Sequence, residues 1–374
     1  MKLINQIVSD PEEHKYGSNQ ISELASSPYP IYLYGAGSMA TDYLQLQKYG
    51  VSIAGVLVDE KYHKQGQKLG ALDVKTIQSM IGGEKLNIIV AFDESLDVIE
   101  RKIPASLPIN KIYHVDIGPL YDKDHLTAQY VNDHLNELQR VYNLCSDQLS
   151  KDALCGFINT KITGNTKYLA KIRTCDIYFP DDIIKLSDDE IFVDCGAYTG
   201  DSSLEFINKV NRKYRKIYAF EPDVRNLKIL NETINSFKIR DMVIIPKGVW
   251  NKEESLKFKV HRNGSHMNSF VETGFVSEDI DICSLDVTSL DEVIDTNEMV
   301  SYIKMDIEGS ELKALEGAKH IIQRHRPRLA ISAYHLKDDI YKIPLYLKSL
   351  NPDYKIYFRQ HHYISTDLVC YAIP

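Results

Sequence analysis

Three short, largely apolar runs in the second half of the chain each end on an acidic residue. The runs and the acids that follow them are Ile191–Val193 with Asp194, Ile217–Phe220 with Glu221, and Tyr302–Met305 with Asp306. Continuous apolar runs of this length are typical of strands in a parallel sheet, which is buried on both faces. Ligands of open α/β sheets bind beyond the carboxyl ends of the strands. We therefore expect the three acids to converge on one crevice.

A glycine-bearing turn follows the first of these acids. Gly196 and Gly200 allow the backbone to turn tightly and to approach a ligand, and the residues from Asp201 onward begin a helix. Glu221 is placed to accept hydrogen bonds from two ribose hydroxyls. The loop has no third glycine, and Asp201 stands where it would repel a pyrophosphate. A cationic nucleoside without phosphate fits better, and S-adenosylmethionine is such a molecule.

Four segments that contain these acids resemble, in order and rough spacing, the FkbM-type methyltransferase family. They are residues 193–197, 218–223, 304–311 and 326–332. The likeness covers about half of the chain, and the segment from Asp306 to Glu311 is the most family-specific. The resemblance implies a class I methyltransferase sheet, S-adenosylmethionine as the methyl donor, and usually methylation of a hydroxyl on a sugar or secondary metabolite. It does not imply which acceptor is methylated.

The predicted cofactor site consists of residues in the loops that follow the first strands of this sheet. They are Asp194, Gly196, Ala197, Tyr198, Gly200, Asp201, Glu221, Pro222, Lys247, Gly248 and Val249. The last three are expected beside the adenine, because Gly248 permits close approach of the backbone. The segment from Tyr178 to Pro180 leaves two alternatives open, a position near the cofactor or plain packing.

Methyl transfer to an alcohol needs a positioned base, because an alcohol is a weak nucleophile until its proton is leaving. The candidates are Asp306, Glu308 and His335, which follow two neighbouring strands of the predicted sheet. A histidine paired with a carboxylate suits a general base. The alternative is that His335 only ends a strand and Glu308 only caps a helix.

A divalent metal is a competing hypothesis at the same place. Its ligands would come from the acids and histidines of this region: Asp306, Glu308, His335, Asp338, Asp339, and one of His361 and His362. Oxygen and nitrogen ligands of this kind could bind a sugar diol through the metal and acidify it. Their spacing is not diagnostic, and we predict no metal.

A second glycine-bearing loop predicts a smaller Rossmann-like domain near the amino terminus. Gly35 and Gly37 follow the apolar run 31–34, and Asp59 follows the run 53–58, close to the spacing of a dinucleotide-binding fold. One hypothesis is an NAD-dependent dehydrogenase or epimerase acting through this loop. We favour a structural or partner-binding module, because no Tyr-x-x-x-Lys pair of the short-chain dehydrogenase kind accompanies the loop. A nucleotide-sugar binding protein without turnover is a further alternative.

The predicted architecture is α/β, with three parts. They are a Rossmann-like accessory domain at residues 1–120, a helical connector at 121–185 and a class I methyltransferase domain at 186–374. The connector is predicted from Leu135, Leu138, Tyr142 and Cys145, which recur at helical spacing. The length of 374 residues is sufficient for two cores.

Composition limits the partners and the compartment. A net charge of −8 argues against nucleic acid as the main partner. No apolar stretch is long enough to span a bilayer, and the first residues lack the apolar core of a signal peptide. Six dispersed cysteines without Cys-x-x-Cys spacing favour a reducing compartment. We expect a cytoplasmic enzyme that acts on a small-molecule or carbohydrate acceptor, with homo-oligomerisation left open.

Overall fold

The computed structural model of the protein describes residues 2–7, 18–94, 96–116, 126–261, 269–270 and 280–374. Contacts divide the chain into two units. Unit 1 comprises Met1–Leu135, Asp152–Arg173 and His362–Thr366, and unit 2 comprises Asn136–Lys151, Thr174–His361 and Asp367–Pro374. Each unit contains a largely parallel sheet together with helices, which confirms the predicted α/β class.

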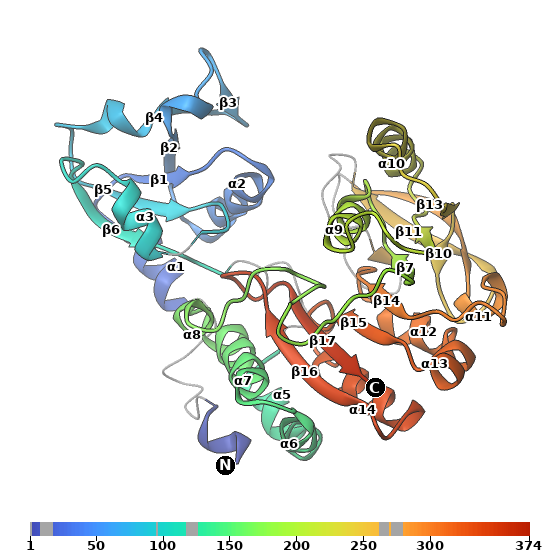
Figure 1. Ribbon diagram of the computed structural model, residues 1–374. Helices are drawn as coiled ribbons and strands as arrows, with labels where there is room; N and C mark the ends of the chain where they lie inside the picture. The colour runs from blue at the N-terminus through green and yellow to red at the C-terminus, as the bar shows by residue number, and fades with distance from the viewer. Residues whose placement is uncertain (1, 8–17, 95, 117–125, 262–268, 271–279) are drawn as a thin grey trace. The chain divides into compact units, whose positions relative to one another are not determined.

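Unit 1 is built on a six-stranded sheet in the order β3-β4-β2-β1-β5-β6, in which only β3 and β4 pair antiparallel (Figure 1). The strands are β1 (Ile31–Tyr34), β2 (Ile53–Val58), β3 (Lys68–Leu69), β4 (Leu72–Thr76), β5 (Leu86–Val90) and β6 (Ile109–Tyr113). Leu33 and Val56 belong to one hydrophobic core, whereas the next residues, Tyr34 and Leu57, belong to another. The sheet is therefore buried on both faces, as its continuous apolar runs predict.

Short helices connect the strands of unit 1. The α-helices between residues 18 and 102 are α1 (Ser18–Ala25), α2 (Ser38–Tyr43) and α3 (Leu96–Lys102). The 3-10 helices are η1 (Leu3–Asn5), η2 (Leu44–Tyr49), η3 (Glu60–Tyr62) and η4 (Ile77–Met80). The glycine loop before α2 thus leads into a helix of only six residues.

Unit 2 is built on a seven-stranded sheet in the order β16-β17-β15-β14-β7-β8-β9 (Figure 1). The strands are β7 (Ile191–Cys195), β8 (Lys216–Phe220), β9 (Met242–Ile245), β14 (Tyr302–Met305), β15 (Arg328–Ser332), β16 (Lys355–Gln360) and β17 (Leu368–Ile373). The five strands from β15 to β9 are parallel, and β17 runs antiparallel to both neighbours. From β7 the chain adds β8 and β9 on one side of the sheet and then β14 and β15 on the other. Because the strand order reverses at β7, the ligand crevice is expected beside the carboxyl end of β7.

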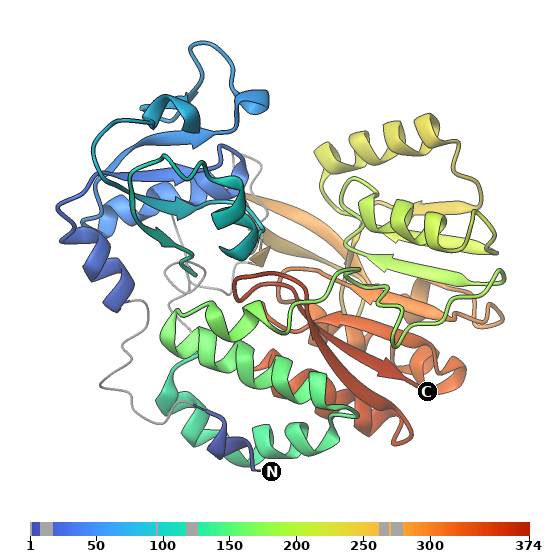
Figure 2. The same cartoon turned by 60° about the vertical axis from the view of Figure 1, so that its left-hand side comes forward.

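Helices cover both faces of this sheet (Figures 1 and 2). They are α9 (Asp201–Lys209), α10 (Val224–Phe237), α11 (Leu290–Val293), α12 (Glu311–Glu316), α13 (Lys319–His325) and α14 (Asp339–Leu350). Phe206 and Ile207 of α9 pack against Phe192 of β7 in one core cluster. All five residues of β7 are buried, which accounts for the apolar run that precedes the glycine turn.

A second, four-stranded sheet of unit 2 has the order β10-β13-β11-β12. Its strands are β10 (Gly248–Val249), β11 (Glu254–His261), β12 (Ser269–Phe270) and β13 (Ile280–Thr288). The region 121–185, predicted as a helical connector, contains helices between residues 128 and 170, whereas residues 171–185 form no helix, and the region is divided between the two units. These helices are α5 (Ala128–Asp133), α6 (Leu135–Leu144), α7 (Gln148–Thr163) and α8 (Lys167–Ala170). No helix within the described residues has the length and apolar character that crossing a bilayer requires.

Candidate active site

A cavity of about 530 Å³ lies at the carboxyl ends of β7, β8 and β14. Its volume is in the range of small-molecule sites. Nine of the predicted residues line it: Gly196, Tyr198, Asp201, Glu221, Pro222, Gly248, Val249, Asp306 and Glu308. Four predicted cofactor residues do not line it: Asp194, Ala197, Gly200 and Lys247. Of these, Lys247 forms an ion pair with Glu253 instead.

Asp194 is fully buried beneath the loop that it was predicted to present. Its carboxylate accepts hydrogen bonds from the hydroxyls of Ser202 and Ser203, both at 2.7 Å, and from the ammonium of Lys304 at 3.1 Å. Lys304 also donates to the carbonyl oxygen of Gly196 at 2.7 Å. Lys304, through its contacts with Asp194 and Gly196, therefore links β14 to the loop after β7. The sequence carried a signal for this role, because a lysine within an apolar strand is rarely buried without a partner.

Gly196 brings two loops of the site into direct contact. Its φ is +80°, and a Cβ at this position would lie 2.1 Å from the carbonyl oxygen of Asp306. No other residue type fits this approach, since a real Cβ atom does not come so close to backbone oxygen. The loop after β7 and the acid after β14 consequently border the same cavity, as their positions at neighbouring strand ends predict.

Glu221 lies almost buried at the end of β8, with its carboxylate held by hydrogen bonds. One oxygen accepts the backbone N–H of Tyr198 at 3.0 Å, and the other accepts the N–H of Asp223 at 2.9 Å and the amide of Asn226 at 3.2 Å. Burial raises the pKa of Glu221 above its usual value, although these hydrogen bonds oppose the shift. The remaining lone pairs suit the predicted ribose contact, which stays a prediction.

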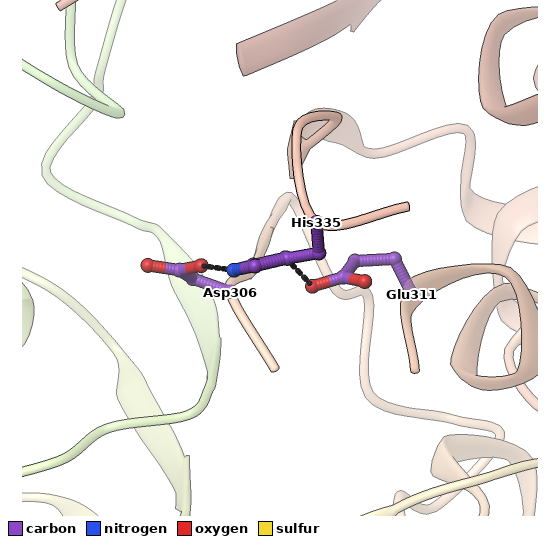
Figure 3. Close-up of side chains that lie close together, drawn as sticks. All are labelled: Asp306, Glu311 and His335. Carbon is purple, nitrogen blue, oxygen red and sulfur yellow. Dashed lines mark ion pairs between the residues drawn. The ribbon is translucent and has the colours of Figure 1, made fainter. Parts of the chain in front are cut away.

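The three predicted catalytic residues meet at the other end of the cavity, together with a fourth residue. Nε2 of His335 is 3.4 Å from an Asp306 oxygen and 3.6 Å from a Glu308 oxygen. Its Nδ1 is 2.9 Å from Glu311, so the imidazole lies between the Asp306 and Glu311 carboxylates (Figure 3). Our sequence interpretation missed Glu311, although it stands in the same acidic segment as Asp306 and Glu308.

The charges of this cluster shift the pKa values of its members in different directions. Burial lowers the pKa of His335, but the carboxylates of Glu311, Glu308 and Asp306 together raise it well above the usual value. Burial raises the pKa of Glu308 to about 8, with His335 opposing and Asp306 and Glu311 adding to the shift. The pKa of Asp306 stays below its usual value despite burial, chiefly because of His335 and Lys304. Glu308 is therefore the carboxylate of this trio that titrates near neutral pH, with His335 charged beside it.

Tyr178 comes from the segment before β7 and lines the same end of the cavity. Its hydroxyl donates a hydrogen bond of 2.6 Å to Asp306. The next residue, Phe179, packs against Phe192 and Phe206 in the core. Phe179 therefore has a packing role, whereas a position of Tyr178 near the cofactor stays a prediction.

Asp306, Glu311 and His335 also form a group that could hold a metal ion, with one ligand atom of each within 4.8 Å of the others. The group does not include the other residues of the competing metal hypothesis, Glu308, Asp338, Asp339, His361 and His362. Asp306 faces Nε2 of the ring and Glu311 faces Nδ1 (Figure 3). Both contacts are ion pairs by distance, and neither ring nitrogen of His335 forms a hydrogen bond of good geometry within the described residues.

Comparisons with known proteins agree with this geometry. The methyltransferase FkbM domain family matches residues 194–356. A crystal structure of a methyltransferase FkbM from Methylobacillus flagellatus KT has a TM-score of 0.68 and 22% identity, and the match covers 99% of this chain and 97% of that chain. No curated protein matches the chain.

Two further solved structures resemble half of the chain more weakly. An rRNA methylase from Streptococcus thermophilus has a TM-score of 0.32 and 19% identity over 50% of this chain and 87% of that one. A SAM-dependent methyltransferase from Aquifex aeolicus has a TM-score of 0.29 and 15% identity over 49% of this chain and 82% of that one. The FkbM structure alone supports the predicted class I methyltransferase fold. The family match at residues 194–356 therefore supports a methyltransferase, with S-adenosylmethionine as the methyl donor.

Proposed function

We propose that the protein is an O-methyltransferase that acts on a hydroxyl of a sugar, nucleotide sugar, glycan or secondary metabolite. The observation that carries the proposal is the pair of carboxylates, Asp306 and Glu308, that face the cavity beside the largely buried His335. Carboxylates and the nearby Tyr178 hydroxyl can hydrogen-bond to an acceptor rich in hydroxyl groups. The family match supports methyl transfer, and the acceptor class rests on these side chains.

The donor end of the cavity supports the binding of the cofactor. When bound, S-adenosylmethionine supplies the methyl group, and its carbon–sulfur bond breaks as the acceptor oxygen attacks. Glu221 would accept the ribose hydroxyls, and the apolar side chains of Val249 and Val287 would flank the adenine. The excess of acidic side chains around the cavity favours a cationic donor.

At the acceptor end, we assign the general base to Glu308. Its ionised carboxylate accepts the hydroxyl proton as the oxygen–methyl bond forms, which leaves a neutral carboxylic acid. His335 stays protonated and keeps a positive charge 3.6 Å from the Glu308 carboxylate. Asp306 holds Nε2 of the ring on the side of the cavity. A base with a pKa near the working pH is the most effective choice for this step.

The test is methyl transfer from S-adenosylmethionine carrying a radiolabelled methyl group to a panel of free sugars, sugar nucleotides, glycans and polyols. Mass spectrometry of the product then locates the methyl group. We expect transfer to a hydroxyl oxygen. A methyl group found on nitrogen or carbon would contradict the proposal.

Binding is checked separately. Calorimetry should show that S-adenosylhomocysteine binds the full chain without any acceptor. If it does not bind, the assignment of the cavity to the donor is wrong, whatever the acceptor panel shows.

A further inference from the structure

His335 contacts carboxylates through both of its ring nitrogens. On the cavity side, Nε2 faces Asp306 at 3.4 Å and Glu308 at 3.6 Å. On the opposite side, Nδ1 faces Glu311 at 2.9 Å, the shortest of the three distances (Figure 3). The first two acids line the cavity, whereas Glu311 and His335 do not. The ring of His335 therefore connects Glu311 to the two acids that line the cavity.

Glu311 is held in a fixed position. It is the first residue of α12 and is fully buried. The oxygen that faces His335 also accepts the backbone N–H of Ile307 at 2.9 Å, and its second oxygen is buried without a hydrogen-bond partner among the described residues. A buried carboxylate without a cation beside it is costly, so its nearest cation, His335, is its natural counter-charge.

We propose that Glu311 is the positioning residue of this site, which holds the His335 ring with Nδ1 facing Glu311 and Nε2 facing Asp306 and Glu308. The proposal rests on the proposed function, in which Glu308 accepts the proton from the acceptor. A carboxylate on one ring nitrogen determines which nitrogen carries a proton and how the ring is oriented. Loss of that partner would allow the ring to turn or to lose its charge.

A second buried acid of this region, Asp339, does not take over this role. Asp339, at the start of α14, is buried, and one of its oxygens accepts the backbone N–H of Leu336 at 2.8 Å. Burial and the nearby charge of Glu311 raise the pKa of Asp339 well above its usual value. Glu311 is therefore the acid that contacts Nδ1 among the described residues, at 2.9 Å.

The experiment uses the full chain with ¹⁵N-labelled histidine, and the His335 signals are identified by their absence in His335→Gln. A pH titration by NMR reports whether each ring nitrogen is protonated. In the wild type we expect both nitrogens of His335 to remain protonated above the usual range of histidine. In Glu311→Gln the pKa of His335 should fall, because the charged partner is lost while an oxygen remains for the Ile307 N–H.

The kinetic arm measures methyl transfer in the same variants. Glu311→Gln should reduce turnover about 10²-fold, the lower end of what a positioned proton-transfer group contributes, with unchanged affinity for S-adenosylhomocysteine. The matched control is Glu316→Gln in the same helix, because Glu316 pairs with Lys313 and lies outside the cluster. That variant should change neither the titration of His335 nor the rate.

Three results would overturn the proposal. A neutral His335 at pH 7 in the wild type would do so without any variant, even if Glu311→Gln fails to fold. An unchanged titration in folded Glu311→Gln would exclude Glu311 as the partner. Broadening of the His335 signals by added Mn²⁺ would make the cluster a metal site instead. None of these readouts needs an acceptor, so their failure is distinguishable from failure of the proposed function.

Discussion

The two parallel sheets of this protein share a sequence pattern but present different surfaces at their carboxyl ends. In unit 2, the glycine turn after β7 borders a cavity, and Glu221 at the end of β8 lines it. In unit 1, the acid in the corresponding position is Asp59, and its carboxylate accepts a 2.6 Å hydrogen bond from the hydroxyl of Tyr34. The same strand–glycine–acid pattern thus ends in a cavity-lining acid in one unit and in an internally bonded acid in the other.

The glycines differ in a similar way. The Cβ that Gly35 lacks would lie 2.9 Å from both the Phe92 ring and the carbonyl oxygen of Ala91. Gly35 therefore allows its loop to pack closely against the residues that follow β5 within unit 1. We learn from the comparison that a glycine loop predicts a tight turn and a parallel sheet, whereas ligand binding depends on what fills the crevice beside that loop.

The largest expected difference between the units is catalytic. Glu308→Gln removes the proposed base while keeping the shape of the side chain, so methyl transfer should fall by ~10²–10⁴-fold. Affinity for S-adenosylhomocysteine should stay nearly constant. The control in unit 1 is Asp93→Asn, since Asp93 follows β5 but pairs with Arg173 at 2.8 Å. Equal turnover of Glu308→Gln and wild type would transfer the base assignment to His335 or Asp306.

The donor site gives the next largest contrast. Glu221→Ala should weaken binding of S-adenosylmethionine by roughly 1.5–3 kcal/mol, because hydrogen bonds to an ionised acceptor are lost. Asp59→Ala removes the equivalent acid of unit 1 and should leave the affinity unchanged. Calorimetry on both folded variants measures the difference. If Asp59→Ala lost as much affinity as Glu221→Ala, the proposed difference between the two units would be wrong.

The pH dependence of turnover sharpens the same contrast. Because the base must be ionised and the pKa of Glu308 is raised to about 8, methyl transfer should rise with pH up to about 8 and then level. Below that value the rate of methyl transfer should rise about tenfold for each pH unit. Single-turnover measurements between pH 6 and 9 test this, and Glu308→Gln should lack the rise. A rate that is flat or falls over this range would rule out Glu308 as the base.

The smallest effect is expected in the glycine loop of unit 1. A Cβ at Gly37 meets no atom within 4 Å, so Gly37→Val should change the free energy of unfolding by less than about 0.5 kcal/mol. Methyl transfer should be unchanged, and calorimetry of the full chain should show no tight binding of NAD. Tight NAD binding that Gly37→Val abolishes would favour the dehydrogenase or epimerase alternative and remove the contrast between the units.

The uncertain position of strand ends limited what the sequence could predict about individual site residues. Asp194 and Glu221 both lie near the end of an apolar run, but Asp194 lies within β7 and Glu221 follows β8. The side chain of Asp194 points into the protein, where Ser202, Ser203 and Lys304 bind it. An acid inside a strand and an acid beyond it look alike in the sequence, because strand ends cannot be located to one residue.

The amino-acid sequence by itself determined the α/β class, the carboxylates at the strand ends and the resemblance to the FkbM family, because apolar periodicity and local motifs are properties of short segments. Only the tertiary structure decided which of these side chains meet. The Tyr178 hydroxyl reaches Asp306 across 128 positions of the chain, and Glu311 turns toward His335 rather than toward the cavity. Such contacts depend on strand order and helix placement, and on the burial that shifts the pKa of Glu308. These are properties of the packed sheet and not of any single segment.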